Sequence, residues 1–507
     1  CIFLYCTLPV FSQPDTVNYT VATGGLSSLG EHAPFWLTTN THGTYTPAKH
    51  SGIIQLGAHS DLSAKKTFDY GFGVQVFNRY DNQFHNTFNV QQAYLEGKIG
   101  FIQVHAGSKQ EFFGNAFHSL SSGSMLISGN APPIPKIAFK TDGYTEIPFT
   151  KGYLEFKAYY SDGMLEKNRH VKRPYVHYKH LSGRLGGDFP VNIQYGFHHA
   201  AIWGGKDPNY GKFPADLTVY KKIITGQQGT ESTTPVEGEK INVLGNHIGS
   251  RNFGLNVTTE KFELGAYWQS IFEDGSGKGY RNAPDGLWGM YYKSQKKKHW
   301  LSSVCIEYIQ TTNQSGDVHQ IDQTQPIDSI LGGNDNYFNH YIYHSGWTHQ
   351  GFTMGSPLIT SPLYDIHYSL RNKNEEQIAK YLPNNNIRGI HTGFQGWINS
   401  EIQYKVLFTY VQNYGLKHPP IESFSNPDIR EELYGIYKEV PYNEQGIVYY
   451  KLPGLDQYSG MIAIAMPIHF FEQKLELQTK FAFDYSEFYG NNLGIHIKLT
   501  KHGILSK

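Results

Sequence analysis

Two stretches near the C-terminus decide the fold: YSGMIAIAMPIHF at residues 458–470 and LELQTKFAFDYS at residues 475–486. Each alternates in polarity, and in the second Phe481 and Tyr485 share one face while Lys480 lies on the other. A soluble β-sandwich has alternating strands too, but they average about 5–6 residues. Runs of about ten or more have the length that a tilted strand needs to cross a bilayer. The two stretches therefore predict a hairpin with one face toward lipid and the other toward a polar lumen.

Similar alternation fills much of the remaining chain, which predicts an all-β, transmembrane antiparallel β-barrel. Turns are tight where these alternating runs meet in pairs, and the connections between the pairs are long. This asymmetry is typical of barrels with short periplasmic turns and longer outer loops, and the turn spacing predicts about 16 to 18 strands. The tight turns lie at residues 65–66, 99–100, 150–151, 260–261, 295–298, 399–400 and 472–474.

The composition agrees with a barrel and excludes a nucleic-acid partner. Aromatic residues make up 15% of the 507 residues and charged residues only 17%, which suits aromatic girdles at two membrane interfaces. A mean hydropathy of −0.46 is compatible with this, because every second strand residue faces a polar lumen. The 43 basic and 43 acidic side chains cancel, so no net field attracts nucleic acid.

The opening CIFLYCTLPVFSQ reads as the tail of a secretory signal peptide, residues 1–12, cut near Ser12 or Gln13. A buried first strand is the alternative for this apolar run. No linker divides the rest, so residues 13–507 are expected to form one barrel domain. Cys305 is the one cysteine outside the leader, and we therefore expect no internal disulfide.

Three long connections predict helices. Residues 426–440 begin with Asn426 as N-cap and Pro427 at the first helical position. Residues 373–382 carry apolar side chains at helical spacing, and residues 213–226 end at a glycine that suits a helix C-terminus. We expect small helical segments beside the barrel.

Catalytic and metal-binding motifs are absent from the sequence. There is no HExxH, GxSxG, P-loop or paired CxxC, so we expect neither an enzyme nor a metal or cofactor. His198 and His199 are adjacent, but neighbours in a strand point to opposite faces and cannot share a metal. A barrel hydrolase is an alternative, with a nucleophile among the serines of residues 119–124 beside His118.

Aromatic and polar residues interleave at residues 335–347, and a glycine-flanked tryptophan follows GFHHAAI at residues 196–202. Aromatic rings pack on the apolar faces of sugars, while Asn, Asp and His form hydrogen bonds with sugar hydroxyls. An aromatic girdle at the lipid headgroups is the alternative reading of the same residues. The predicted polysaccharide-binding residues are Trp203, His199, Asp335, Asn336, Tyr341, His344 and Trp347.

Several separated motifs, in order along the chain, resemble the Wzi-like capsule assembly proteins in the version found in Bacteroidetes-type bacteria. They are PFWLTTNTHG (34–43), SSGSMLISGNAPPIPK (121–136), GFHHAAIWGG (196–205), DNYFNHYIYHSGWTHQGFTMGSPL (335–358) and FTYVQNYG (408–415). The resemblance implies an outer-membrane β-barrel of about 18 strands with some helix, in which residues 119–136 form a plug-like loop.

The resemblance also implies a function: non-enzymatic, lectin-like binding of capsular or exopolysaccharide during its assembly and attachment at the cell surface. The expected partners are that polysaccharide, outer-membrane lipid with lipopolysaccharide, and polysaccharide export machinery. A porin-like channel for oligosaccharides, the barrel hydrolase and a soluble β-protein are the alternatives.

Overall fold

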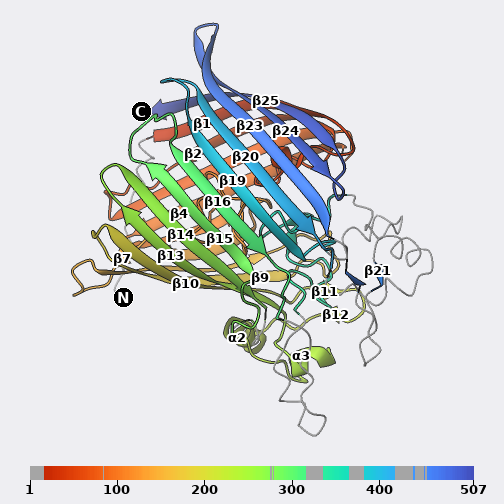
Figure 1. The fold of residues 1–507 in the computed structure, drawn as a ribbon. Helices are drawn as coiled ribbons and strands as arrows, with labels where there is room; N and C mark the ends of the chain where they lie inside the picture. Colours follow the sequence, from red (N-terminus) through yellow and green to blue (C-terminus); the bar gives the residue numbers. More distant parts are fainter. Residues whose placement is uncertain are drawn as a thin grey trace, which may run out of the picture.

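A single antiparallel sheet closes on itself to form the wall of a barrel in the computed structural model (Figure 1). The structure describes residues 16–83, 85–273, 277, 279–315, 335–364, 382–416, 438–439, 450–451 and 454–506. Closure occurs at β1 (Thr16–Leu29), which pairs with β2 (His50–Ser60) on one side and with β25 (Asn492–Ser506) on the other. A closed barrel has no free edge, so every strand satisfies its backbone groups on both sides.

The wall has 18 strand positions, as predicted. The sheet contains 19 strand segments, but β6 (Pro135–Thr141) and β7 (Thr145–Glu146) pair in succession with β8 (Leu154–Met164) and occupy one position. The other wall strands, in order, are β3 (Phe68–Asp81), β4 (His85–Ile99), β5 (Ile102–Ser108), β9 (Tyr175–Leu185), β10 (Val191–Trp203), β13 (Asn246–Thr258), β14 (Phe262–Phe272), β15 (Gly286–Ser294), β16 (Ser303–Gln310), β19 (Ile387–Trp397), β20 (Gln403–Asn413), β23 (Leu455–Phe470) and β24 (Gln473–Ser486).

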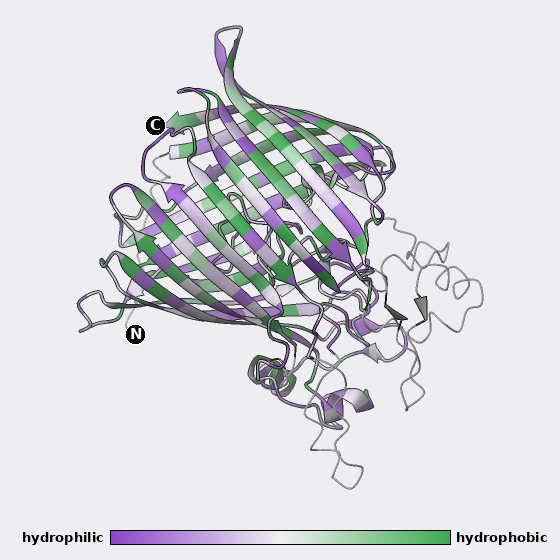
Figure 2. Cartoon of the chain, viewed as in Figure 1, coloured by the Kyte–Doolittle hydropathy of each residue, from purple (hydrophilic) through white to green (hydrophobic). Residues whose placement is uncertain are grey.

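The predicted C-terminal hairpin is β23 and β24, and its two faces are as expected. Ile462 lies opposite Phe481 in the register, and both are about half exposed on the outer surface. Their neighbours Ala482 and Asp484 are 2% and 4% exposed because they point into the filled interior. Figure 2 shows the same alternation of hydrophobic and hydrophilic residues along the strands of the wall.

Short turns gather at one end of the barrel and long connections mainly at the other. Two residues join β23 to β24 and two join β4 to β5, whereas residues 204–245 separate β10 from β13 and residues 311–386 separate β16 from β19. Two short connections, residues 82–84 and 487–491, also lie at the long-loop end. Residues 186–190 form a further short turn that the sequence did not single out.

One predicted helix is confirmed. α2 (Leu217–Thr225) begins after Asp216, whose carboxylate accepts two backbone N–H bonds, and ends at Gly226, which has a φ of 65°. The predictions for residues 426–440 and 373–382 fall almost wholly outside the described residues, as does the leader at residues 1–12. No helix in the described part of the chain is long and apolar enough to cross a membrane.

Eight smaller elements lie in the connections of the described part of the chain. Two are the helices α1 (Phe35–Thr38) and α3 (Glu237–Ile241). The others form three two-stranded pairs: β11 (Lys206–Asp207) with β12 (Gly211–Lys212), β17 (Thr348–His349) with β18 (Phe352–Thr353), and β21 (Lys438–Glu439) with β22 (Tyr450–Lys451).

Candidate functional site

Residues 119–136, called the lumen segment below, run through the barrel interior and end in the first two residues of the wall strand β6. Glu307 on β16 points inward between the outward-facing Ile306 and Tyr308 and is 1% exposed. Its carboxylate accepts bonds from the hydroxyls of Ser121 and Ser122, both at 2.6 Å, and from the Ser122 backbone N–H at 2.7 Å. Hydrogen bonds to a charged acceptor are stronger than neutral ones, so Glu307 is a firm anchor for this segment.

Other inward-pointing side chains hold the lumen segment at further points. Gln269 on β14 accepts the Met125 backbone N–H at 2.8 Å, and His391 on β19 lies 2.7 Å from the Leu120 carbonyl. The lumen segment therefore spans the interior between β14, β16 and β19. The prediction that it shapes or closes the lumen as a plug-like loop stays a prediction.

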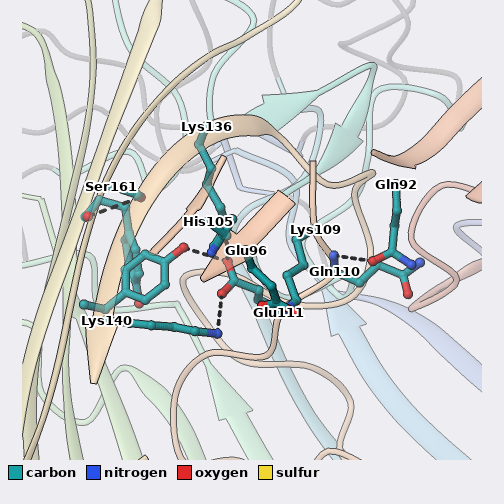
Figure 3. A network of polar contacts seen from close by, with 11 residues as sticks. Gln92, Glu96, His105, Lys109, Gln110, Glu111, Lys136, Lys140 and Ser161 are labelled. Atoms are coloured by element: carbon teal, nitrogen blue, oxygen red, sulfur yellow. Dashed lines mark hydrogen bonds and ion pairs between the residues drawn. The ribbon is translucent and has the colours of Figure 1, made fainter. Parts of the chain in front are cut away.

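A network of ion pairs holds the chain where it leaves β5 and enters the lumen (Figure 3). The Glu111 carboxylate receives Lys136 at 2.8 Å, Lys140 at 3.2 Å and the Tyr159 hydroxyl at 2.6 Å. Lys109 pairs with Glu96 on β4 in the same network. Charges of both signs are thereby neutralised inside the barrel, where unpaired charges would be costly.

The long-loop end brings together the two regions predicted to bind polysaccharide. The Tyr343 hydroxyl donates to the Gly204 carbonyl at 3.4 Å, which joins residues 335–347 to the loop after β10. Arg169, in the loop after β8, donates to the Gly346 and Thr348 carbonyls at 3.1 and 2.9 Å. These loops form one packed layer above the wall.

An ion pair stabilises the same layer. The Glu166 carboxylate lies 2.6 Å from Nδ1 of His349 and 3.4 Å from Arg169. Burial alone would raise the pKa of Glu166, but the hydrogen bond from His349 and the charges of Arg169 and His349 lower it to about 2. Glu166 is therefore ionised at neutral pH.

Both predicted tryptophans are buried at the long-loop end. Trp347 is 1% exposed and donates its indole N–H to the Leu126 carbonyl of the lumen segment at 2.7 Å. Trp203 is 7% exposed and packs against Tyr175 and Tyr220, with ring centroids 4.8 and 5.6 Å away. Tryptophan is among the side chains that bury the most apolar area. The burial of these two rings therefore stabilises the contact between the loops and the barrel.

Three of the predicted polar residues are also held within the protein. Asp335 accepts the Ser315 hydroxyl at 2.5 Å, and Asn336 accepts the side-chain amide of Asn385 at 2.6 Å. His199 lies on β10, separate from residues 335–347, with its Nε2 2.8 Å from Nδ1 of His247. These contacts position the loops and the wall.

Of the predicted residues, Tyr341 is exposed, and His344 and Asn336 are half-buried. The Tyr341 ring is 50% exposed and stacks on His340 at a centroid distance of 4.5 Å. His344 stacks on His170 at 4.1 Å, and its Nε2 lies 2.6 Å from the Tyr341 carbonyl. Tyr341 and His344 thus form a firmly supported aromatic patch at the long-loop end.

The structure also shows a polar cavity that sequence reasoning did not identify. It measures about 520 Å³, lies in the half of the lumen toward the short turns and is lined by side chains from β1, β2, β3, β4, β24 and β25. Alternation predicted that such side chains point inward. Their gathering in one place depends on the register between strands, for which a single sequence carries no signal.

The residues that suggested a metal site or a hydrolase do not come together in the structure. His198 points inward and stacks on His180 at 4.6 Å, whereas His199 points outward, so the two do not meet. The Ser124 hydroxyl donates to the Phe113 carbonyl, and no serine hydroxyl in residues 119–124 is bonded to His118. Among the described residues, no group of three His, Cys, Asp or Glu side chains could hold a metal ion.

Comparison with solved structures finds several similar chains. The chain is similar to the Escherichia coli outer-membrane protein Wzi, described as involved in group 1 capsule assembly and as a carbohydrate-binding β-barrel, with 13% identity over 96% of this chain and 84% of that chain and a TM-score of 0.54. It is also similar to Acinetobacter baumannii OccAB4 (8% identity, 97% and 99% coverage, TM-score 0.44) and to Pseudomonas aeruginosa OccK3 (9%, 96% and 96%, TM-score 0.45).

Comparison with sequences gives a family. A search of curated proteins finds no match. The family model described as "Capsule assembly protein Wzi" matches residues 37–360, more than half of the chain, including the loop layer up to Thr360 and the whole lumen segment. The chain therefore belongs to the Wzi capsule assembly protein family, and it is a β-barrel of the outer membrane.

Proposed function

We propose that the protein binds capsular or exopolysaccharide at the cell surface, without enzymatic activity, and so takes part in assembling and attaching that polymer. The observation that carries the proposal is the patch of Tyr341 and His344 at the long-loop end, which is the outer end of a barrel of this kind. Membership of the capsule assembly family and the carbohydrate binding described for Escherichia coli Wzi support it.

The patch suits a sugar because it is rigid before a ligand arrives. Gly238 of α3 lies against the Tyr341 hydroxyl so closely that a Cβ there would come within 2.7 Å of it. His340 supports one face of the Tyr341 ring, and the half-exposed remainder is open to a ligand. A preformed aromatic surface loses little entropy on binding, and the exposed face of the Tyr341 ring can pack on the apolar face of a sugar.

Two further partners follow from the expected setting. Outer-membrane lipid and lipopolysaccharide would contact the outward apolar side chains, such as Leu95 at 70% exposed and Phe481 at 53%. A partnership with polysaccharide export machinery stays a prediction.

The test is the retention of surface polysaccharide by cells that lack this gene and carry it back as variants. We expect the deletion to shed polymer into the medium, the wild-type gene to restore cell-bound polymer, and Tyr341→Ala to restore much less. Tyr153→Ala is the matched control, because Tyr153 is 47% exposed at the short-turn end. Unchanged retention in the deletion strain would reject the proposed function.

A further inference from the structure

Three lysines converge on the inner wall beside the start of the lumen segment. Lys405 on β20 lies opposite Ala463 on β23, and Ala463 lies opposite Lys480 on β24, so one small residue separates the two lysines. Lys498 on β25 is the diagonal neighbour of Lys480, whose direct partner is His496. Diagonal neighbours are about 7–8 Å apart, which long side chains span.

The three amines have neutral partners or none. Lys405 donates to the Ser119 carbonyl at 2.8 Å, and Lys498 donates to the Gln55 side-chain oxygen at 3.0 Å. Lys480 makes no hydrogen bond or ion pair within the described part of the chain, and none of the three has a carboxylate within 4.0 Å there. The site thus carries an excess of positive charge.

The carboxylates that face the same region do not cancel this charge. Asp484 accepts the Phe35 backbone N–H at 3.0 Å and the Ser459 hydroxyl at 2.7 Å, which commits it to the wall near α1. Glu476 and Asp61 line the cavity toward the short turns, and Asp61 lies 3.7 Å from His59 near the turn after β2. The three lysines repel one another when the site is empty, and a bound anion attracts all three. The site therefore favours an anion over a neutral ligand.

The cavity of about 520 Å³ reaches this group of lysines at Lys498, and its volume lies within the range of about 300–1,000 Å³ typical of small-molecule sites. Lys498 and the Tyr94 ring line it, together with five glutamines: Gln55, Gln75, Gln92, Gln110 and Gln478. Amides bond sugar hydroxyls as donors and acceptors, and a tyrosine ring packs on a sugar face.

A second cavity of about 420 Å³ connects this region with the short-turn rim. It shares Glu476, Thr500 and His502 with the first, and it extends to Ser400 in the turn after β19 and to Lys474 at the start of β24. Short turns are the periplasmic side of outer-membrane barrels. A ligand would therefore enter from the periplasm, on the side of the lumen segment away from the loop layer.

We propose that the short-turn half of the lumen binds an acidic saccharide segment, whose carboxylate lies among Lys405, Lys480 and Lys498 and whose neutral rings lie along the glutamine-lined cavity. This deepens the proposed function and rests on it, because it assigns the polymer a negative charge and a second contact inside the barrel.

The test is calorimetric titration of the purified full-length protein in detergent with a galacturonic acid trisaccharide, with maltotriose as the neutral probe and acetate as the free anion. We expect the acidic trisaccharide to bind more tightly than either, and more weakly as salt increases. Lys480→Gln should weaken its binding about tenfold, because a hydrogen bond to a charged group is lost, with little change for maltotriose. Lys405→Gln should act similarly, and Lys261→Gln in an exposed turn should not.

Each outcome decides between the parts of the proposal. Equal binding by the wild type and both lumen variants, or equal binding of the acidic and neutral trisaccharides, would overturn the luminal site. Loss of polymer retention in Tyr341→Ala together with that result would leave the proposed surface function standing. Weakened acidic binding in Lys480→Gln with normal retention in the deletion strain would keep the luminal site and reject the cellular function.

Discussion

Removing the Glu307 carboxylate should release the lumen segment. Glu307→Leu deletes the acceptor for three bonds from Ser121 and Ser122, and it leaves those donors buried without a partner. A buried donor left without a partner typically costs about 1–3 kcal/mol, so three such donors cost at least about 3 kcal/mol together. Since about 1.4 kcal/mol is a tenfold change in an equilibrium, the undocked population of the lumen segment should increase at least about 10²-fold.

Conductance in planar lipid bilayers measures this release, because ions pass when the interior is open. We expect low conductance from the wild type and frequent, larger openings from Glu307→Leu. Glu307→Gln should lie between the two, since its amide retains one acceptor oxygen. Glu155→Leu is the matched control: Glu155 also points inward and pairs with Arg184 on β9, but it does not contact the lumen segment.

Equal conductance of Glu307→Leu and Glu155→Leu, with both proteins folded as heat-modifiable barrels, would refute the anchoring role of Glu307. High conductance of the wild type itself would show that the lumen segment narrows the interior without closing it, and would favour the channel alternative.

Three further outcomes are expected. Burial alone would raise the pKa of Glu166, but the hydrogen bond from His349 and a neighbouring guanidinium lower it to about 2. The ionised carboxylate should therefore stabilise the fold fully above about pH 4.5, and this stabilisation should be lost as the pH falls toward 2. Over that pH window, Tm should change with pH in the wild type and change less in Glu166→Gln. Trp347→Ala should cost about 3–5 kcal/mol of unfolding free energy in detergent, whereas Trp347→Phe should lose mainly one hydrogen bond, about 0.5–1.5 kcal/mol. Gly238→Ala should displace the Tyr341 ring, because the new Cβ would lie 2.7 Å from its hydroxyl; polymer binding should fall without loss of Tm, since alanine favours a helix.

The outer wall was predictable because alternation is a local signal. Phe481 and Lys480 are adjacent in sequence, and the two-residue period of a strand sends them to lipid and lumen in any register. The same logic gave the tight turns and the helix within residues 213–226, because the glycine that ends it is adjacent in the chain. The motifs of residues 121–136 and 335–358 indicated the family, and the family model confirms it.

The candidate site was predictable only in part, because the type of a residue does not determine whether its side chain is buried or exposed. Trp347 and Tyr341 occur in one aromatic stretch, and both suit a sugar platform. The structure buries the first against Leu126 and leaves the second half exposed. Which of them is covered depends on a segment more than 200 residues earlier in the chain, so neighbouring residues carry no signal of it.

The sequence by itself determined the barrel, its polar interior, its long-loop end and its family, since each follows from patterns within a few residues or from ordered motifs. Only the tertiary structure decided what meets inside: the contact of Glu307 with Ser122, and the row that joins Lys405 to Lys480. These contacts depend on the register between strands that are distant in the chain. That register is set by closure of the whole sheet, so it becomes visible only when the barrel is complete.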